Sequence, residues 1–333
     1  MYILAFETSC DDTSVALMKD DKLVAMSTRT QLEHEITGGV VPEVAARSHA
    51  NAIFPCIDDV LAESKIPLSE IDFIACTKEP GLAPSLLTGK TVARSLANLL
   101  EIPLIWVHHI EAHMFANFLD RKREEVIFPN VVLTISGGHT EIYLWKSLFE
   151  FEMIGQTRDD AVGEAYDKVA KMLGMGFPGG AKVEQKALEY RKNHKNISDE
   201  ITQIFPRPYL DKTGLEFSFS GLKSAVKRFI DENPIKNNDD ICKVCYAFQE
   251  AIFDVLLHKF FLAQEKCHTS QIILAGGVSA SATLRNRIQE KAQNLGIDFL
   301  APKKNIYSMD NAAMIGILAY YKVLEGEKLE VKN

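Results

Sequence analysis

Two histidines four residues apart are the first feature of this sequence that could do chemistry. The stretch Val107-His108-His109-Ile110-Glu111-Ala112-His113 follows an apolar run and opens a helical pattern that continues to Leu119. On a helix, His109 and His113 lie on one face and point their imidazoles in the same direction. This spacing suits two nitrogen ligands of one divalent transition metal ion. The alternative interpretation is that the two histidines merely flank a buried helix.

Short turns rich in hydroxyl groups, acids and glycine form a second candidate set. Glu7-Thr8-Ser9-Cys10-Asp11-Asp12-Thr13-Ser14 joins two expected strands, and Ser136-Gly137-Gly138-His139-Thr140 joins two others. Glycines let backbone amides approach an anion closely, and small polar turns can hold phosphate or metal-bound water. Because Asp, Ser and Gly are also ordinary turn residues, neither turn identifies a ligand by itself.

Further acidic and glycine-rich stretches lie downstream. Asp160 is expected to be the N-cap of a helix that carries Glu164 and Asp167. Residues 176–180 form a glycine-rich turn that leads into another helix. Residues 275–280 form a junction of strand, glycines and helix, which suits a nucleotide phosphate or ribose.

Two other features have ordinary explanations. Asp310 precedes an apolar helix and is expected to be its N-cap. Thr88-Gly89-Lys90-Thr91 resembles the end of a Walker A loop, but Pro84 stands where that loop requires its first glycine. Because the segment also has the apolar period of an amphipathic helix, we expect no P-loop here.

Composition limits the class of protein. A chain of 333 residues, 47% of them hydrophobic, is long enough for two domains, and its net charge of -8 predicts no broad polyanion-binding surface. Apolar runs are too short for a membrane span, the start does not resemble a signal peptide, and six scattered cysteines fit a reducing cytoplasm. The Cys242–Cys245 pair lacks a second pair, so core packing is expected there.

The expected elements repeat along the chain. Three strands at 2–6, 14–18 and 23–27 are echoed by strands at 130–135, 141–145 and 149–154. The sequence therefore predicts an α/β fold of duplicated strand-hairpin units in two lobes, the plan that sugar kinases, actin and the Hsp70 ATPase share. The expected divisions are an N-terminal lobe 1–128, a C-terminal lobe 129–303 with a helical insertion at about 175–235, and a C-terminal helix at about 304–333.

Several motifs in one order give a specific resemblance. They are Glu7-Thr8-Ser9-Cys10-Asp11, the His109/His113 pair, Ser136-Gly137-Gly138-His139-Thr140, Asp160 to Lys168, Phe217-Ser218-Phe219-Ser220-Gly221-Leu222-Lys223 and Gly276-Gly277-Val278. Together they resemble, essentially end to end, the bacterial tRNA N6-adenosine threonylcarbamoyltransferases, the TsaD family. The fold that this implies is two-lobed and built from RNase H-like units, as in actin and Hsp70.

The resemblance implies a reaction and a set of site residues. The threonylcarbamoyl group of threonylcarbamoyl-AMP would pass to N6 of adenosine 37 in tRNAs that read A-starting codons. By analogy one divalent metal ion per subunit, Fe²⁺ with Zn²⁺ as the alternative, is held by His109, His113 and Asp310. This ligand set implies that the C-terminal helix at about 304–333 packs back near the first lobe. The adenylate-binding positions implied are Thr134, Ile135, Ser136, Gly137, Gly138, Asp167 and Gly180, together with Glu184 and Ser281. Family members carry Asp and Asn at the last two positions.

The remaining expectations concern the base and the partners. We hypothesise that Asp11 orients or deprotonates the attacking amine, since it lies in the first turn. The resemblance implies tRNA as substrate, a TsaB-like paralogue and a TsaE-like ATPase as partners, and a cytoplasmic location without membrane attachment.

Three other functions would each explain part of the sequence. A metallopeptidase would explain the histidine pair, but no Glu follows His109 directly, so the HExxH motif is absent. A small-molecule kinase would explain the lobes and glycine turns but not the histidines with Asp310. A catalytically silent scaffold predicts that the metal ligands are dispensable.

Overall fold

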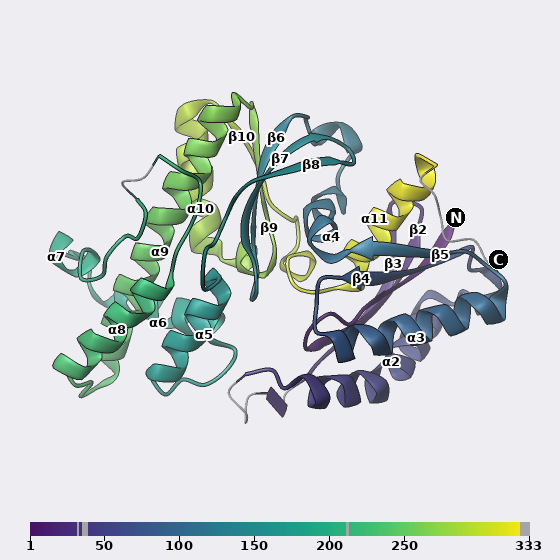
Figure 1. Ribbon diagram of the computed structural model, residues 1–333, viewed down its shortest axis with the longest axis horizontal. Helices are drawn as coiled ribbons and strands as arrows, with labels where there is room; N and C mark the ends of the chain where they lie inside the picture. The colour runs from purple at the N-terminus through teal and green to yellow at the C-terminus, as the bar shows by residue number, and fades with distance from the viewer. Residues whose placement is uncertain (32, 35–38, 211–212, 327–333) are drawn as a thin grey trace. The chain divides into compact units, whose positions relative to one another are not determined.

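The computed structural model describes residues 1–31, 33–34, 39–210 and 213–326 (Figure 1). Contacts divide the chain into two compact units. The first contains residues 1–126 and the chain from Pro302 onward, and the second contains residues 127–301. The first unit is therefore assembled from both ends of the chain.

The first unit is a five-stranded sheet covered on both faces, with strand order β3-β2-β1-β4-β5. Its strands are β1 (Tyr2–Glu7), β2 (Asp12–Lys19), β3 (Lys22–Thr30), β4 (Phe73–Glu79) and β5 (Leu104–His108). Its helices are α2 (Pro42–Ser64), α3 (Ala83–Leu100), α4 (His109–Phe115) and α11 (Ala312–Leu324).

Both faces of the central strand β1 are apolar, which explains why helices cover both sides of this sheet. Leu4 and Phe6 belong to the core that the sheet shares with α2 and α3. On the other face, α11 packs on β1 and β2 and also contacts α4 (Figure 1). Gly316 permits this close approach, because a Cβ there would lie 2.4 Å from Cγ of Met18.

The second unit contains another five-stranded sheet, with order β10-β9-β6-β7-β8. Its strands are β6 (Asn130–Ile135), β7 (Thr140–Ser147), β8 (Glu150–Gln156), β9 (Gln271–Ala275) and β10 (Asp298–Leu300). Its helices are α5 (Val162–Met172), α6 (Gly179–Asn193), α7 (Asp199–Thr202), α8 (Ser220–Glu232), α9 (Asn238–Cys267) and α10 (Ala282–Leu295).

The two sheets have the same topology. In each, the first three strands form an antiparallel meander, and two later strands lie parallel to the first strand on its other side. The internal duplication expected from the sequence is confirmed.

The rejected P-loop is a helix, as its period predicted. Residues 88–91 lie within α3, and Gly89 packs against the first turn of the chain. A Cβ at Gly89 would lie 2.3 Å from Oγ1 of Thr8, and the Thr8 hydroxyl donates a hydrogen bond to the Ser85 carbonyl at 3.0 Å. This glycine therefore brings α3 close to the β1–β2 turn.

The structure also bears on the expectations for the cysteines and for membrane-spanning segments. All six cysteines are free, and Cys242 and Cys245 are buried in α9, as expected for core packing. Among the described residues, no helix combines the length and apolarity needed to cross a bilayer.

Candidate metal centre and glycine turns

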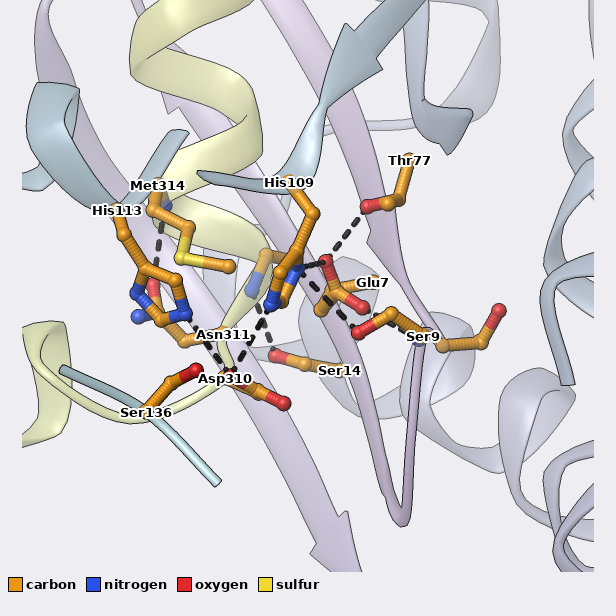
Figure 2. Close-up of polar contacts among 12 residues, drawn as sticks. Glu7, Ser9, Ser14, Thr77, His109, His113, Ser136, Asp310, Asn311 and Met314 are labelled. Atoms are coloured by element: carbon orange, nitrogen blue, oxygen red, sulfur yellow. Dashed lines mark hydrogen bonds and ion pairs between the residues drawn. The ribbon is translucent and has the colours of Figure 1, made fainter. Parts of the chain in front are cut away.

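The histidine pair and Asp310 meet in the first unit. His109 is the first residue of α4, His113 lies one turn later, and Asp310 precedes α11 (Figure 2). Asp310 Oδ1 lies 3.1 Å from His113 Nε2 and 3.6 Å from His109 Nε2. Both histidines are buried, whereas the Asp310 side chain keeps 23% of its surface exposed. One side of the group is thus open.

This geometry fits a metal ion. Bonds of about 2.0–2.1 Å in a tetrahedral site place neighbouring ligand atoms roughly 3.3 Å apart. The separations of 3.1 and 3.6 Å lie on either side of that value, and all three candidate ligand atoms lie within 4.8 Å of one another. Two imidazoles and one carboxylate suit iron or zinc and leave coordination positions for substrate. His109, His113 and Asp310 can therefore hold a metal ion.

Asp310 is not the N-cap of α11, contrary to the expectation. The cap is Asn311, whose side chain accepts a hydrogen bond from the Met314 amide at 3.0 Å. Ser14 Oγ accepts a second bond, from the Ala312 amide at 3.0 Å. Because its neighbours satisfy the helix terminus, the Asp310 carboxylate is directed toward the histidines (Figure 2).

A buried carboxylate that the sequence did not single out lies behind His109. Glu7, at the end of β1, is fully buried, and its Oε2 lies 3.0 Å from His109 Nδ1. The same oxygen accepts a hydrogen bond from Thr77 Oγ1 at 2.6 Å, and Oε1 accepts one from the Ser9 amide at 2.5 Å. The available signal was an acid that ends an otherwise apolar strand.

The two histidines have opposite electrostatic surroundings. Burial disfavours a charged imidazole at His109, but the carboxylates of Glu7 and Asp310 outweigh it and raise its pKa to about 9. At His113, burial dominates and lowers the pKa. Burial opposes ionisation of Glu7, yet the charge of His109 holds the Glu7 pKa below its usual value.

Asp11 lies in the turn between β1 and β2, as expected. Burial, together with the charge of Asp310, raises its pKa. Burial also raises the pKa of Asp12 to about 7, although the Thr30 hydroxyl donates a hydrogen bond to its carboxylate. A carboxylate with a raised pKa is a better proton acceptor than an ordinary aspartate.

In the second unit, a turn after β6 is tightly supported on one side and bare on the other. It consists of Ser136, Gly137 and Gly138 and follows Thr134 and Ile135 at the end of β6. Its support comes from two glycines elsewhere in the chain, whose added Cβ atoms would lie 2.6 Å from the Ser136 carbonyl oxygen and 2.5 Å from that of Ile135 (Gly163 and Gly276). A Cβ at Gly137 or Gly138 would meet nothing within 4 Å.

Asp167 contacts the start of α6 at Gly179, the residue before Gly180. Asp167 Oδ1 accepts a hydrogen bond from the Gly179 amide at 2.6 Å, in the first turn of the helix. Gly179 is required there, because a Cβ would lie 2.6 Å from the Tyr166 carbonyl oxygen. Gly180 faces open space.

Glu184 and Ser281, the two departures from the family pattern, contact each other. Ser281 Oγ donates a hydrogen bond to Glu184 Oε1 at 2.7 Å. The same hydroxyl caps α10 by accepting a bond from the Leu284 amide at 3.2 Å. The longer side chain of Glu184 therefore reaches the hydroxyl group of the shorter Ser281 side chain.

Asp160 is not a helix cap, contrary to the expectation. The N-cap of α5 is Ala161, and the Asp160 carboxylate accepts hydrogen bonds from Lys168 at 2.8 Å and Lys223 at 2.9 Å. Asp159 accepts bonds from the hydroxyl groups of Ser218 and Ser220. These two acids therefore connect α5 to the Phe217–Lys223 motif, a role that local sequence did not indicate.

Comparison of the sequence with known families gives a consistent result. A family model described as tRNA N6-adenosine threonylcarbamoyltransferase, TsaD, matches residues 22–317. The protein of that name from Geobacter metallireducens is 41% identical over 320 residues, which cover 95% of this chain and 90% of the relative. The protein of that name from Staphylococcus aureus is 41% identical over 327 residues, which cover 97% and 92%.

Comparison with solved structures concerns the fold. HypF of T. kodakarensis matches with a TM-score of 0.61 and 13% identity, over 98% of this chain and 48% of HypF. Component A of the (R)-2-hydroxyglutaryl-CoA dehydratase of Acidaminococcus fermentans matches with a TM-score of 0.53 and 17% identity, over 97% and 99%. The expected α/β fold of the actin, Hsp70 and sugar-kinase type is confirmed.

The comparisons also decide between the rival functions. The relatives are transferases by name, and they align along nearly the whole chain. A small-molecule kinase and a silent scaffold are not favoured. The chain belongs to the tRNA N6-adenosine threonylcarbamoyltransferase family, and it is a tRNA-modifying transferase.

Proposed function

We propose that this enzyme transfers the threonylcarbamoyl group of threonylcarbamoyl-AMP to N6 of adenosine 37 in tRNAs that read A-starting codons. The N6 nitrogen would form a bond to the carbamoyl carbon, the bond from that carbon to the phosphate oxygen would break, and AMP would leave with the electron pair. N6 would lose one proton. The observation that carries the proposal is the group of His109, His113 and Asp310 in a chain that matches this family over residues 22–317.

The group of His109, His113 and Asp310 would hold one divalent ion per subunit, Fe²⁺ with Zn²⁺ as the alternative. When bound, the ion would supply Lewis acidity toward the carbonyl or the departing phosphate. The nitrogen and oxygen donors suit both metals. The open side at Asp310 leaves room for a substrate atom.

Asp11 is the proposed acceptor of the amine proton. Its raised pKa, which follows from burial and from the charge of Asp310, suits a base. Equal single-turnover rates for Asp11→Ala and wild type would contradict this role.

The adenylate would be bound by the second unit, at Thr134, Ile135, Ser136, Gly137, Gly138, Asp167, Gly180, Glu184 and Ser281. The bare glycines support this, because backbone amides without a Cβ in front of them can approach a phosphate or ribose. Asp167 would act indirectly, since its carboxylate fixes the first turn of α6.

The chain would work with partners in the cytoplasm. We propose that residues 1–128 with 304–333, and residues 129–303 with the insertion at 175–235, are its two functional lobes. The net charge of -8 supports a need for help in holding tRNA, which a TsaB-like paralogue and a TsaE-like ATPase would give. Full-strength tRNA affinity of the isolated chain at physiological salt would count against this need.

The test is mass spectrometry of nucleosides from a tRNA that carries adenosine 37. The tRNA is incubated with threonylcarbamoyl-AMP, the partners and either wild type or His109→Ala/His113→Ala. We expect threonylcarbamoyladenosine from wild type alone. Product from both proteins would support the reaction and show that it does not need the two histidines. No product from either, with metal and partners present, would reject the proposed reaction.

A further inference from the structure

We propose that Glu7 is a positioning residue for the metal centre: its carboxylate holds the Nδ1–H of His109, so that the Nε2 lone pair faces the ion. This inference rests on the proposed metal site. It assigns a role to a buried acid that does not itself belong to the ligand group.

The hydrogen bonds around Glu7 determine which nitrogen of His109 carries the hydrogen. The carboxylate can only accept, and its two oxygens already receive the Ser9 amide and the Thr77 hydroxyl. At 3.0 Å from Oε2, His109 Nδ1 must therefore donate. A neutral His109 then has its lone pair on Nε2, the nitrogen that faces Asp310 Oδ1 at 3.6 Å.

The position of Glu7 is rigid. It is paired with Ser14 in the β1–β2 ladder, and its side chain has no exposed surface. Thr77 approaches it from β4, and Gly81 lies so close to Ser9 that a Cβ would stand 2.7 Å from the Ser9 carbonyl oxygen. The acid cannot rotate away without disrupting the sheet, so the orientation of His109 is set before an ion arrives.

His113 provides an internal contrast. Its Nδ1 is buried and has no hydrogen-bond partner among the described residues. The two histidine ligands therefore receive different support, and Glu7 acts on one of them. Carboxylates that hold the second nitrogen of a ligand histidine commonly contribute 10- to 100-fold in metal affinity.

Glu7→Gln is the informative variant, because an amide cannot reproduce two acceptors. One orientation of Gln directs its NH₂ at His109 Nδ1 and favours the tautomer with the lone pair on the wrong nitrogen. The other orientation directs the NH₂ at the Ser9 amide, so that two hydrogen-bond donors face each other. We expect Glu7→Gln to bind Zn²⁺ about 10- to 100-fold more weakly than wild type.

Two matched controls separate this hydrogen bond from charge and packing. Thr77→Val removes a neutral hydrogen bond to Glu7 Oε2 but keeps the carboxylate that accepts from His109 Nδ1, and Asp12→Asn removes a nearby charge that does not contact His109. Both should stay within about threefold of wild type in affinity. Glu7→Asp keeps the charge, but its side chain is too short to hold His109 Nδ1. It tests the same hydrogen bond if Glu7→Gln does not fold.

The measurement is competition for Zn²⁺ against a chromophoric chelator, using the full-length chain. Nitrogen NMR of the zinc-loaded protein labelled in histidine reads the tautomer of His109, which a general loss of stability would not invert. We expect Nδ1–H in wild type and an altered His109 signal in Glu7→Gln.

The outcomes separate the two proposals. If His113→Ala bound Zn²⁺ as tightly as wild type, the metal centre would be wrong and the role of Glu7 would fall with it. If His113→Ala lost the ion while Glu7→Gln and Glu7→Asp kept wild-type affinity and tautomer, only the role of Glu7 would be overturned.

Discussion

Two histidines one helical turn apart, His109 and His113, are chemically unequal in this protein. Two carboxylates raise the pKa of the first to about 9, whereas burial lowers that of the second. Their spacing indicated a metal site without deciding against a plain buried helix, and the resemblance to the transferase family added Asp310 as a ligand. Their inequality was not predictable, because its cause, Glu7, is separated from His109 by 102 residues in the sequence.

Asp12 provides a pH-dependent prediction at the residue scale. Its pKa of about 7 lies above the ordinary aspartate pKa of 3.8, so the folded state binds the proton more tightly than the unfolded state. Stability from this group is therefore present at acid pH and is lost as pH rises through about 7. We expect Asp12→Asn to raise the Tm of the metal-free protein, and by at least about 2 °C more at pH 8 than at pH 5.

Thermal unfolding followed by circular dichroism at the two pH values is the measurement. The reading depends on the difference between the pH values rather than on either Tm alone. An equal rise at both would mean that Asp12 does not titrate in this range.

The Glu184–Ser281 contact gives a second prediction at this scale. Glu184→Asp should weaken adenylate binding severalfold, because the shorter acid cannot reach Ser281 Oγ from its position in α6. Asn extends further than Ser, so Ser281→Asn should recover affinity in the Glu184→Asp background. The coupling energy expected from a hydrogen bond is about 1 kcal/mol.

Calorimetric titration of the four proteins with a non-reactive adenylate analogue completes the double-mutant cycle. Additive effects of the two substitutions would show that the residues act independently.

At the scale of elements, local pattern predicted the strands and the duplication well, since apolar alternation and small-residue turns determine both. It failed at helix starts. At Asp310-Asn311 two good capping residues are adjacent, and the backbone of α11 makes the second one the cap. The expectation of a cap at Asp160 is wrong because its partners, Lys168 and Lys223, lie 8 and 63 residues further along the chain, outside a local capping pattern.

The packing of α11 should control the metal site without touching it. A larger residue at Gly316 would collide with Met18 and displace the helix that follows Asp310. We expect Gly316→Val to destabilise the first unit by about 1–3 kcal/mol and to weaken Zn²⁺ binding, although every ligand is intact.

Chemical denaturation and chelator competition check this pair of effects. Gly221→Ala is the control, since a Cβ there meets nothing within 4 Å. Wild-type metal affinity in Gly316→Val would show that Asp310 is positioned independently of α11.

At the scale of the whole molecule, the first unit consists of segments from the two ends of the chain. The helix α11 covers one apolar face of its sheet. The two lobes could be predicted because the strand pattern repeats along the chain. The return of the last helix is a contact between distant segments, so only the resemblance to the family predicted it.

Removal of the segment after Ala301 should therefore damage the first unit more than the second. The truncated chain lacks Asp310 and exposes the face of β1 and β2 that α11 covers. We expect no Zn²⁺ binding and rapid proteolysis within residues 1–126, with residues 127–301 more resistant. Limited proteolysis with mass-spectrometric mapping reads this directly, and equal protection of the two units would contradict it.

The meeting of His113 with Asp310 joins residues 197 positions apart, with the whole second unit synthesised between them. On the ribosome, both histidines are therefore made before the second unit, and Asp310 is made only after it. Until then one face of the first sheet is uncovered, which favours chaperone binding at this stage. We therefore expect that a polypeptide that ends before Asp310 cannot capture the ion.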